Sequence, residues 1–311
     1  MNRLMRIARS AVALAVFASG AAGVVHAKPA CDRACLTGFA DTYFKALVDN
    51  HASAVPLALN VKVTLNGQAM KLDQAFWDSA ERTIYRWDIV NEQLGDVASE
   101  AVVLNADGSK TMYMARLKVL NGKITEVETI KANKGEADRL WDPDNLTAVS
   151  PALQLSIREA DQDSYYGLIA AAESYWRAFQ TNGTDTYHPA SLMPDARRFE
   201  NGVQTTGLVR NGVYASASEG FDKGRFKGRN LWDRRYPVVD TERGIVLSIV
   251  RFGIKDGMKS ESTATANDRL VAEFFCVKSG KIQEIHAVLF NLPDAKPTGW
   301  EPQFGPARGG L

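Results

Sequence analysis

The chain has 311 residues, and its 37 lysines and arginines against 36 aspartates and glutamates give a formal net charge of +1 at pH 7. A near-neutral chain argues against a nucleic-acid-binding protein, which presents a basic surface to the phosphates. The locally basic stretch at residues 222–235 is more typical of a solvated loop than of a phosphate track. The length favours about two domains of ordinary size.

The first 27 residues are typical of a secretory signal peptide. Arg3, Arg6 and Arg9 precede an apolar run of small and branched residues that ends at Ala27. The alternative is an uncleaved anchor, but the run is short, and no later stretch approaches the ~20 apolar residues that cross a bilayer. We therefore expect a periplasmic or secreted protein that begins at Lys28 and has no stable membrane anchor. Loss of three arginines from the 37 basic residues leaves 34 against 36 acidic residues, a charge of −2.

Three cysteines follow the predicted signal peptide: Cys31, Cys35 and Cys276. On a helix, Cys31 and Cys35 would lie on one face with Cα atoms about 6 Å apart, within reach of a disulfide. In an oxidising compartment, that bridge and a long-range link from either residue to Cys276 both remain open. We expect one disulfide and one free, buried thiol. No second cysteine pair or suitably spaced histidine accompanies them, so no metal site is predicted.

The rest of the chain contains an internal duplication. The segment ADTYFKALVDN at residues 40–50 matches AESYWRAFQTN at residues 172–182, and both have the apolar periodicity of an amphipathic helix. Each helix precedes a strand and then an Asn-Gly pair, at Asn66 and Asn201, which is the strongest short signal of a hairpin. A further helix is expected around residues 72–80.

The end of each copy predicts antiparallel strands. YRWDIVNEQLGDVAS matches RRYPVVDTERGIVLS, and LKVLNGKITEVETI matches FCVKSGKIQEIHAV, in which Asn-Gly and Ser-Gly join two strands. Helices followed by a run of strands predict an α+β unit, with helices packed on one face of a curved antiparallel sheet. The expected boundaries are a signal peptide at 1–27, a first domain at 28–134, a linker at 135–163, a second domain at 164–295 and a tail at 296–311.

These segments resemble a bacterial and fungal family of unknown function whose members look like tandem SnoaL-like domains of the nuclear-transport-factor-2-like superfamily. The resemblance rests on CDRACLTGFADTY, ENGVQTT, RRYPVVDTERGIV, the two GKI strands and a closing PTGW, and it covers nearly all of the chain after the signal peptide. It implies two cone-shaped domains, each enclosing an apolar pocket, that pack as a pseudo-dimer; association into a homo-oligomer is left open. Superfamily enzymes such as ketosteroid isomerase, scytalone dehydratase and limonene epoxide hydrolase mostly work without a cofactor. Other members are binding modules, and the fold alone does not choose between these roles.

The resemblance also implies which residues line a pocket. In the superfamily, the residues three and five beyond the isoleucine of each GKI strand look into the pocket, which selects Val127 and Thr129 in the first copy and Ile285 and Ala287 in the second. The epoxide hydrolase type carries an aspartate at the position of Thr129 and Ala287, and this aspartate is absent from both copies. The candidate ligand-binding residues are Arg116, Val127, Thr129, Arg234, Phe274 and Ile285.

His286 is a candidate proton shuttle. If Ser279-Gly280 is a two-residue loop, counting outward places Glu273 directly opposite His286, so that both share a face of the sheet. The same count in the first copy places Ala115 opposite Glu128. A carboxylate beside an imidazole raises the histidine pKa and fixes its tautomer, as general acid–base catalysis requires. The alternative, which the apolar alternation favours, puts this pair on the face where two such domains pack together.

A second polar set lies on one predicted strand. Arg234, Tyr236 and Asp240 alternate along it and therefore share a face. The set suits the binding and polarisation of a phenolic or carbonyl oxygen, and the alternative is an ordinary cross-strand ion pair. The candidate catalytic residues are thus His286, Glu273, Asp240 and Tyr236.

Together these features predict a cofactor-independent lyase, isomerase or dehydratase that uses acid–base chemistry on a small apolar or aromatic compound. The alternative is a noncatalytic binding or interaction module for an apolar ligand. A catalytic pocket contains a titratable group with a displaced pKa, whereas a carrier pocket can be wholly apolar. The sequence has no glycine-rich phosphate loop, serine nucleophile elbow or His-rich metal motif, so no cofactor is expected.

Overall fold

The structure is a computed structural model that describes residues 31–74, 76–137, 139–254, 268–292 and 298–303. The predicted signal peptide at 1–27 lies outside these residues, as does much of the predicted tail. In the part that is described, no helix combines the length and the apolar character needed to span a membrane.

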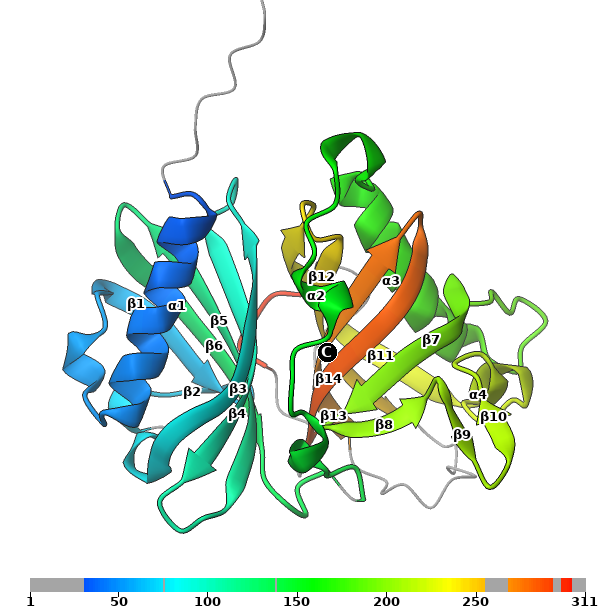
Figure 1. The fold of residues 1–311 in the computed structure, drawn as a ribbon, viewed down its shortest axis with the longest axis horizontal. Coiled ribbons are helices and arrows are strands. Elements are labelled where there is room, and N and C mark those ends of the chain that lie inside the picture. Colours follow the sequence, from blue (N-terminus) through cyan, green and yellow to red (C-terminus); the bar gives the residue numbers. More distant parts are fainter. Residues whose placement is uncertain (1–30, 75, 138, 255–267, 293–297, 304–311) are drawn as a thin grey trace, which may run out of the picture.

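The first half of the chain packs one helix on a six-stranded sheet (Figure 1). Helix α1 (Arg33–Val48) lies against β3 and β4 and buries Tyr43 and Leu47. The sheet has the order β2-β1-β6-β5-β4-β3. Its strands are β1 (Leu57–Leu65), β2 (Gln68–Ala69), β3 (Ala80–Asn91), β4 (Asp96–Asn105), β5 (Lys110–Leu120) and β6 (Lys123–Ala132).

The second half repeats this plan. Helix α3 (Tyr165–Thr181) packs on β11 and β12 of a sheet with the order β11-β12-β13-β14-β7-β8. The strands of this sheet are β7 (Leu192–Glu200), β8 (Val203–Thr206), β11 (Arg229–Asp240), β12 (Ile245–Ile254), β13 (Asp268–Lys278) and β14 (Lys281–Leu292). The short elements α2 (Pro151–Gln154), β9 (Leu208–Arg210), β10 (Val213–Ala215) and α4 (Glu219–Asp222) lie outside it.

Two details of the predicted architecture are wrong. Each sheet is mixed rather than antiparallel, because β1 runs parallel to β6, and β7 runs parallel to β14. After each Asn-Gly hairpin the chain crosses to the far edge of the sheet, so the meander that follows ends beside the first long strand. The helix predicted at residues 72–80 is replaced by two 3₁₀ turns, Leu72–Gln74 and Trp77–Ser79, which direct Leu72 and Trp77 into the core.

The two sheets pack against each other in the middle of the molecule, and the long helices α1 and α3 cover their outer faces (Figure 1). One apolar cluster draws on both sheets, with Trp87 of β3 and Phe274 of β13 at a centroid distance of 4.8 Å. Two further clusters lie between each sheet and its own helix. The contact between the halves is therefore built like the core of a sandwich.

Buried charges join the halves at this contact. Glu128 of β6 accepts hydrogen bonds at 3.1 Å from Nε of Arg116 and from Nη1 of Arg235, which belongs to the second half. Arg116 also contacts Asp96 at 3.1 Å and Glu126 at 2.7 Å. Burial opposes the charge of Glu128, but the guanidinium groups of Arg235 and Arg116 hold its pKa below the usual value. The carboxylate is thus a shared anion between two cations.

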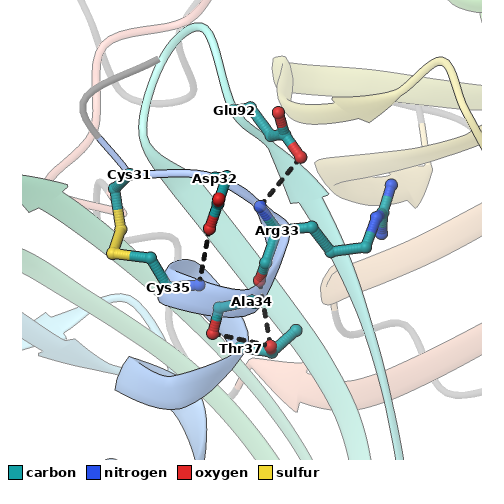
Figure 2. The surroundings of a disulfide bond; sticks show 7 residues. All are labelled: Cys31, Asp32, Arg33, Ala34, Cys35, Thr37 and Glu92. Atoms are coloured by element: carbon teal, nitrogen blue, oxygen red, sulfur yellow. Dashed lines mark hydrogen bonds between the residues drawn. A yellow bond between two sulfur atoms is a disulfide. The ribbon is translucent and has the colours of Figure 1, made fainter. Parts of the chain in front are cut away.

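The disulfide links Cys31 and Cys35, with Cα atoms 5.2 Å apart. This is one of the two pairings that the sequence left open, and Cys276 is free and buried, as expected. Cys31 precedes the helix rather than lying on it, because Asp32 caps the first turn by accepting from the Cys35 amide at 3.1 Å (Figure 2). The enclosed Arg33 extends to the second half, where its guanidinium donates to Asp240 at 2.8 and 2.9 Å.

Candidate active site

A cavity of about 680 Å³ opens between the second sheet and the helix that covers it. Its walls come from α3, β7, β13 and the segment around α4. Aromatic rings supply much of the apolar wall, among them Trp176, Phe179, Phe226 and Phe252. A pocket of this size suits a small molecule.

A larger cavity of about 900 Å³ lies where the two halves meet, beside Arg33 and Asp240. Its charged side chains are already bound to one another, since Arg33 forms ion pairs with Asp240 at 2.8 Å and with Glu242 at 2.9 Å. We therefore place the candidate active site in the smaller cavity of the second half, where an acidic group has a displaced pKa.

Strand register brings two carboxyl groups to this cavity. Ala287 of β14 pairs with Glu273 of β13 on one side and with Glu200 of β7 on the other. Directly paired residues point to the same face, so both glutamates and Ala287 face the helix side of the sheet. The two outer strands lie about 10 Å apart, because neighbouring strands are separated by about 4.8 Å. Ala287, which lies between the two glutamates on the middle strand, has only a methyl side chain.

Glu273 is the buried acid of the pair. Its side chain is almost fully buried, and burial together with the negative charge of Glu200 raises its pKa to about 8. Arg198 and the hydroxyl of Tyr175 act in the opposite direction and lower it. Glu273 is therefore predominantly a neutral carboxylic acid at pH 7.

Glu200 has the opposite environment. Its carboxylate lies 3.3 Å from Nε of Arg198, whose Nη1 also donates to the Tyr175 hydroxyl at 3.0 Å. Nε of Arg198 donates in addition to Thr205 Oγ1 at 2.9 Å, so the guanidinium is fixed from two strands and one helix. One neutral acid and one ion-paired carboxylate, on the two strands that flank β14, can act as an acid–base pair.

The first half has no equivalent of this pair. The same register joins Ala115 to Thr129 and Thr129 to Leu65, where the second half has Glu273, Ala287 and Glu200. Aromatic rings fill the corresponding space, with Phe76 and Tyr113 at 5.1 Å and the hydroxyls of Tyr43 and Tyr113 2.7 Å apart. The first half is therefore a packed scaffold at the place where the second half carries charged groups.

Comparison with known proteins also distinguishes the second half. Residues 161–289 match the family model of a domain of unknown function, DUF8021. No curated protein matches the chain. In the part of the chain that the structure describes, no group of His, Cys, Asp and Glu side chains is placed to hold a metal ion.

Similar solved structures include NTF2-like proteins. A candidate polyketide cyclase from Xanthomonas campestris pv. campestris is 22% identical with a TM-score of 0.27, covering 30% of this chain and 88% of its own. An NTF2-like protein of unknown function from Burkholderia xenovorans LB400 is 11% identical with a TM-score of 0.27, covering 33% and 88%. A candidate ketosteroid isomerase from Kribbella flavida DSM 17836 is 14% identical with a TM-score of 0.27, covering 37% and 90%. We draw no conclusion about activity from these matches.

The structure separates the predicted pair of Glu273 and His286. A β-bulge places Gln283 opposite no residue, so His286 pairs with Phe274, and Glu273 pairs with Ala287. The first copy has the same bulge at Thr125, and Glu128 therefore pairs with Arg116 rather than Ala115. Because one extra residue reverses the alternation, the predicted register is wrong in both hairpins.

His286 lies in the contact between the two sheets. Its Nδ1 is 2.9 Å from Glu100 of the first half and its Nε2 is 3.0 Å from Glu284. Burial disfavours its charged form, but these two carboxylates outweigh burial and raise the pKa of His286 to about 9. Phe199 stacks on the imidazole at 4.8 Å. The side chain is a cationic link between the halves and does not face the candidate active site.

The second predicted set also divides. Tyr236 donates to Glu173 of α3 at 2.5 Å, and Arg234 forms an ion pair with the same glutamate at 3.0 Å. Asp240 instead binds Arg33 in the contact between the halves. A register shift between Arg235 and Val238 reverses the alternation, so the prediction that Tyr236 and Asp240 share a face is wrong.

The predicted ligand-binding residues lie on both faces. Val127, Thr129 and Ile285 face the helix of their own half, where the resemblance places a pocket wall. Arg116 and Phe274 face the other half instead, so their assignment to a pocket is wrong. The bulges again explain the error. They shift the register by one residue, and the predicted face of the sheet for these residues is therefore the opposite of the observed one.

Three residues of the site were missed from the sequence: Glu200, Arg198 and Tyr175. Glu200 and Arg198 come from β7, whose parallel pairing with β14 was not predicted. Tyr175 was treated only as an apolar residue of its helix. The sequence offered one partial signal, the prediction that Ala287 lines a pocket, but the acidic neighbours of Ala287 follow only from the observed register.

Proposed function

We propose that the second half is a cofactor-independent acid–base enzyme of SnoaL-like type, which isomerises or dehydrates a small compound with an aromatic or apolar body. The observation that carries the proposal is the placement of two unlike carboxyl groups, Glu273 and Glu200, on either side of Ala287 in a cavity. Pairs of titratable groups with divergent environments are typical of acid–base catalysis.

The two glutamates have different roles in this mechanism. The Glu200 carboxylate removes a proton from a carbon of the substrate, and neutral Glu273 gives a proton to an oxygen or to a second carbon. In a dehydration, the C–H and C–O bonds break, a C=C bond forms, and the hydroxyl leaves as water with the proton from Glu273. Arg198 holds the Glu200 carboxylate and donates to the hydroxyl of Tyr175. In this mechanism Arg198 and Tyr175 stabilise negative charge on an oxygen of the substrate.

The titration of Glu273 tests the proposal without a known substrate. With ¹³C-labelled glutamate, a carboxyl resonance that is absent from Glu273→Gln should titrate at about 8, so Glu273 is protonated below that pH and ionised above it. In Glu200→Gln the same resonance should titrate at lower pH, because a like charge has been removed. A titration of Glu273 near the ordinary value of 4.5 would contradict the proposal.

The alternative is a binding module, which the aromatic wall of Phe179 and Phe226 favours. A carrier requires the apolar wall, but it does not require one neutral and one ion-paired carboxyl group. If Glu273→Gln and Glu200→Gln bind aromatic ligands normally and Glu273 titrates near 4.5, the carrier is the better account.

We also infer that the protein is exported with its first 27 residues removed. The disulfide between Cys31 and Cys35 supports this inference, because such bonds persist in oxidising compartments. N-terminal sequencing of the protein recovered from the periplasm or medium should begin at Lys28. A chain recovered only from the cytoplasm, with Met1 in place, would contradict export.

A further inference from the structure

The candidate active site has a second charged end, formed by Arg229 of β11 and Arg269 of β13. Along β13, residues Arg269, Val271 and Glu273 alternate and point to the same side of the strand. Glu273 lies four positions after Arg269 on the strand, which places their backbones about 13 Å apart. The cavity is therefore elongated. The guanidinium groups of Arg229 and Arg269 lie at one end, and the carboxyl groups lie at the other end together with Arg198.

Arg229 belongs to the same end of the cavity. Leu231 pairs with Phe252, and Phe252 pairs with Arg269, so these three side chains share a face. Arg229 lies two residues before Leu231 and faces the same way, with its guanidinium over the Phe252 ring at 5.3 Å. Burial, and next the positive charge of Arg269, lower the pKa of Arg229, as expected for two guanidinium groups at the same end of a cavity.

An apolar section separates the two ends. Val271 lies between Arg269 and Glu273 on the strand, and Leu289 of the neighbouring strand also lines the cavity. Phe179 and Phe226 also line the cavity, with their ring centroids 4.5 Å apart. Two cations, a wall of apolar side chains and an acid–base pair thus follow one another along a single cavity.

We propose that this cavity binds an elongated aromatic carboxylate, whose anionic group lies at Arg229 and Arg269 and whose opposite end reaches Glu273. An arginine fork matches a carboxylate in geometry and charge, and the flat apolar section matches aromatic rings. The proposal rests on the proposed function only in that the end of the ligand near Glu273 is the end that reacts. The binding of the anionic end is a separate property of the two arginines.

The test compares a carboxylate with its neutral isostere on the full mature chain with its disulfide intact. Calorimetric titration with biphenyl-4-carboxylate and with biphenyl-4-carboxamide should show that the carboxylate binds about tenfold or more tightly, as expected for charge-assisted hydrogen bonds. Arg269→Gln and Arg229→Gln should each weaken carboxylate binding about tenfold and change carboxamide binding less than about twofold. Arg177→Gln, which removes an exposed arginine of α3 outside the cavity, should change neither.

Three results would overturn the proposal: equal binding of the two compounds, no binding of the carboxylate, or an equal loss of both compounds in the arginine variants. The titration of Glu273 separates this proposal from the proposed function. Charge-selective binding together with a Glu273 that titrates near 4.5 supports the carboxylate site and contradicts the acid–base mechanism. A Glu273 that titrates at about 8 without charge selectivity supports the mechanism and contradicts the carboxylate site.

Discussion

Replacing Glu128 by alanine should lower the free energy of unfolding by about 3–5 kcal/mol at pH 7, because it breaks a buried ion-pair network from one side. Glu128 is the anion that Arg116 and Arg235 share between the two sheets. Its removal leaves both guanidinium groups buried with one carboxylate fewer. Urea unfolding of the chain from Lys28 onward, followed by circular dichroism, measures the loss.

Glu126→Ala is the matched control for this prediction. Glu126 binds the same Arg116 at 2.7 Å, but 35% of its side chain is exposed. A partly exposed ion pair is worth less than about 1 kcal/mol, so the control should be close to the unmodified protein in stability. Equal losses in the two variants would show that the buried network does not hold the halves together.

The effect of Glu128→Ala should also depend on pH. The folded-state pKa of Glu128 lies below its ordinary value of 4.5. Its contribution to stability is therefore complete above pH 4.5 and is lost as the pH falls through the lower folded-state pKa. The difference in stability between the unmodified chain and the variant should narrow in acid.

Replacing Glu273 by glutamine should reduce kcat/KM by about 10²–10⁴-fold, the range typical of a lost general acid. Glutamine keeps the shape of the side chain and cannot transfer the proton. Aromatic β-hydroxy carbonyl compounds and β,γ-unsaturated ketones, incubated in D₂O and followed by proton NMR, provide the assay. In the unmodified protein, activity that uses the neutral acid should fall as the pH rises through about 8.

The control for Glu273→Gln is Glu159→Gln, which removes an exposed carboxylate from a 3₁₀ turn outside the cavity. This variant should retain full activity and the fall above pH 8. If Glu273→Gln kept its activity within a few-fold, proton transfer by Glu273 would be ruled out.

Local patterns in the sequence predict much of this fold. The two long helices follow from apolar residues at helical spacing, and the hairpins follow from Asn66, Asn121, Asn201 and Ser279, all of which adopt positive φ before a glycine. These signals are local, because each one depends on a few neighbouring residues. The duplication strengthens them, since each half gives an independent instance of the same pattern.

The pairing of strands that are distant in the sequence could not be predicted. The parallel contact of β7 with β14 joins residues far apart in the chain, and no local signal marks it. Glu200 is brought to Glu273 only through that contact and through Ala287 between them. The bulges could not be predicted for another reason. Thr125 and Gln283 are ordinary strand residues, and their side chains do not indicate a β-bulge.

The two halves have the same bulge at the same place, at Thr125 and Gln283 after each GKI segment. In each half the bulge turns the residues that follow it toward the helix of that half. Glutamates at the sites of Ala115 and Leu65 would therefore face the helix of the first half, as Glu273 and Glu200 do in the second. Two point substitutions would transfer the acidic pair, with no insertion or deletion and no change in the path of the backbone.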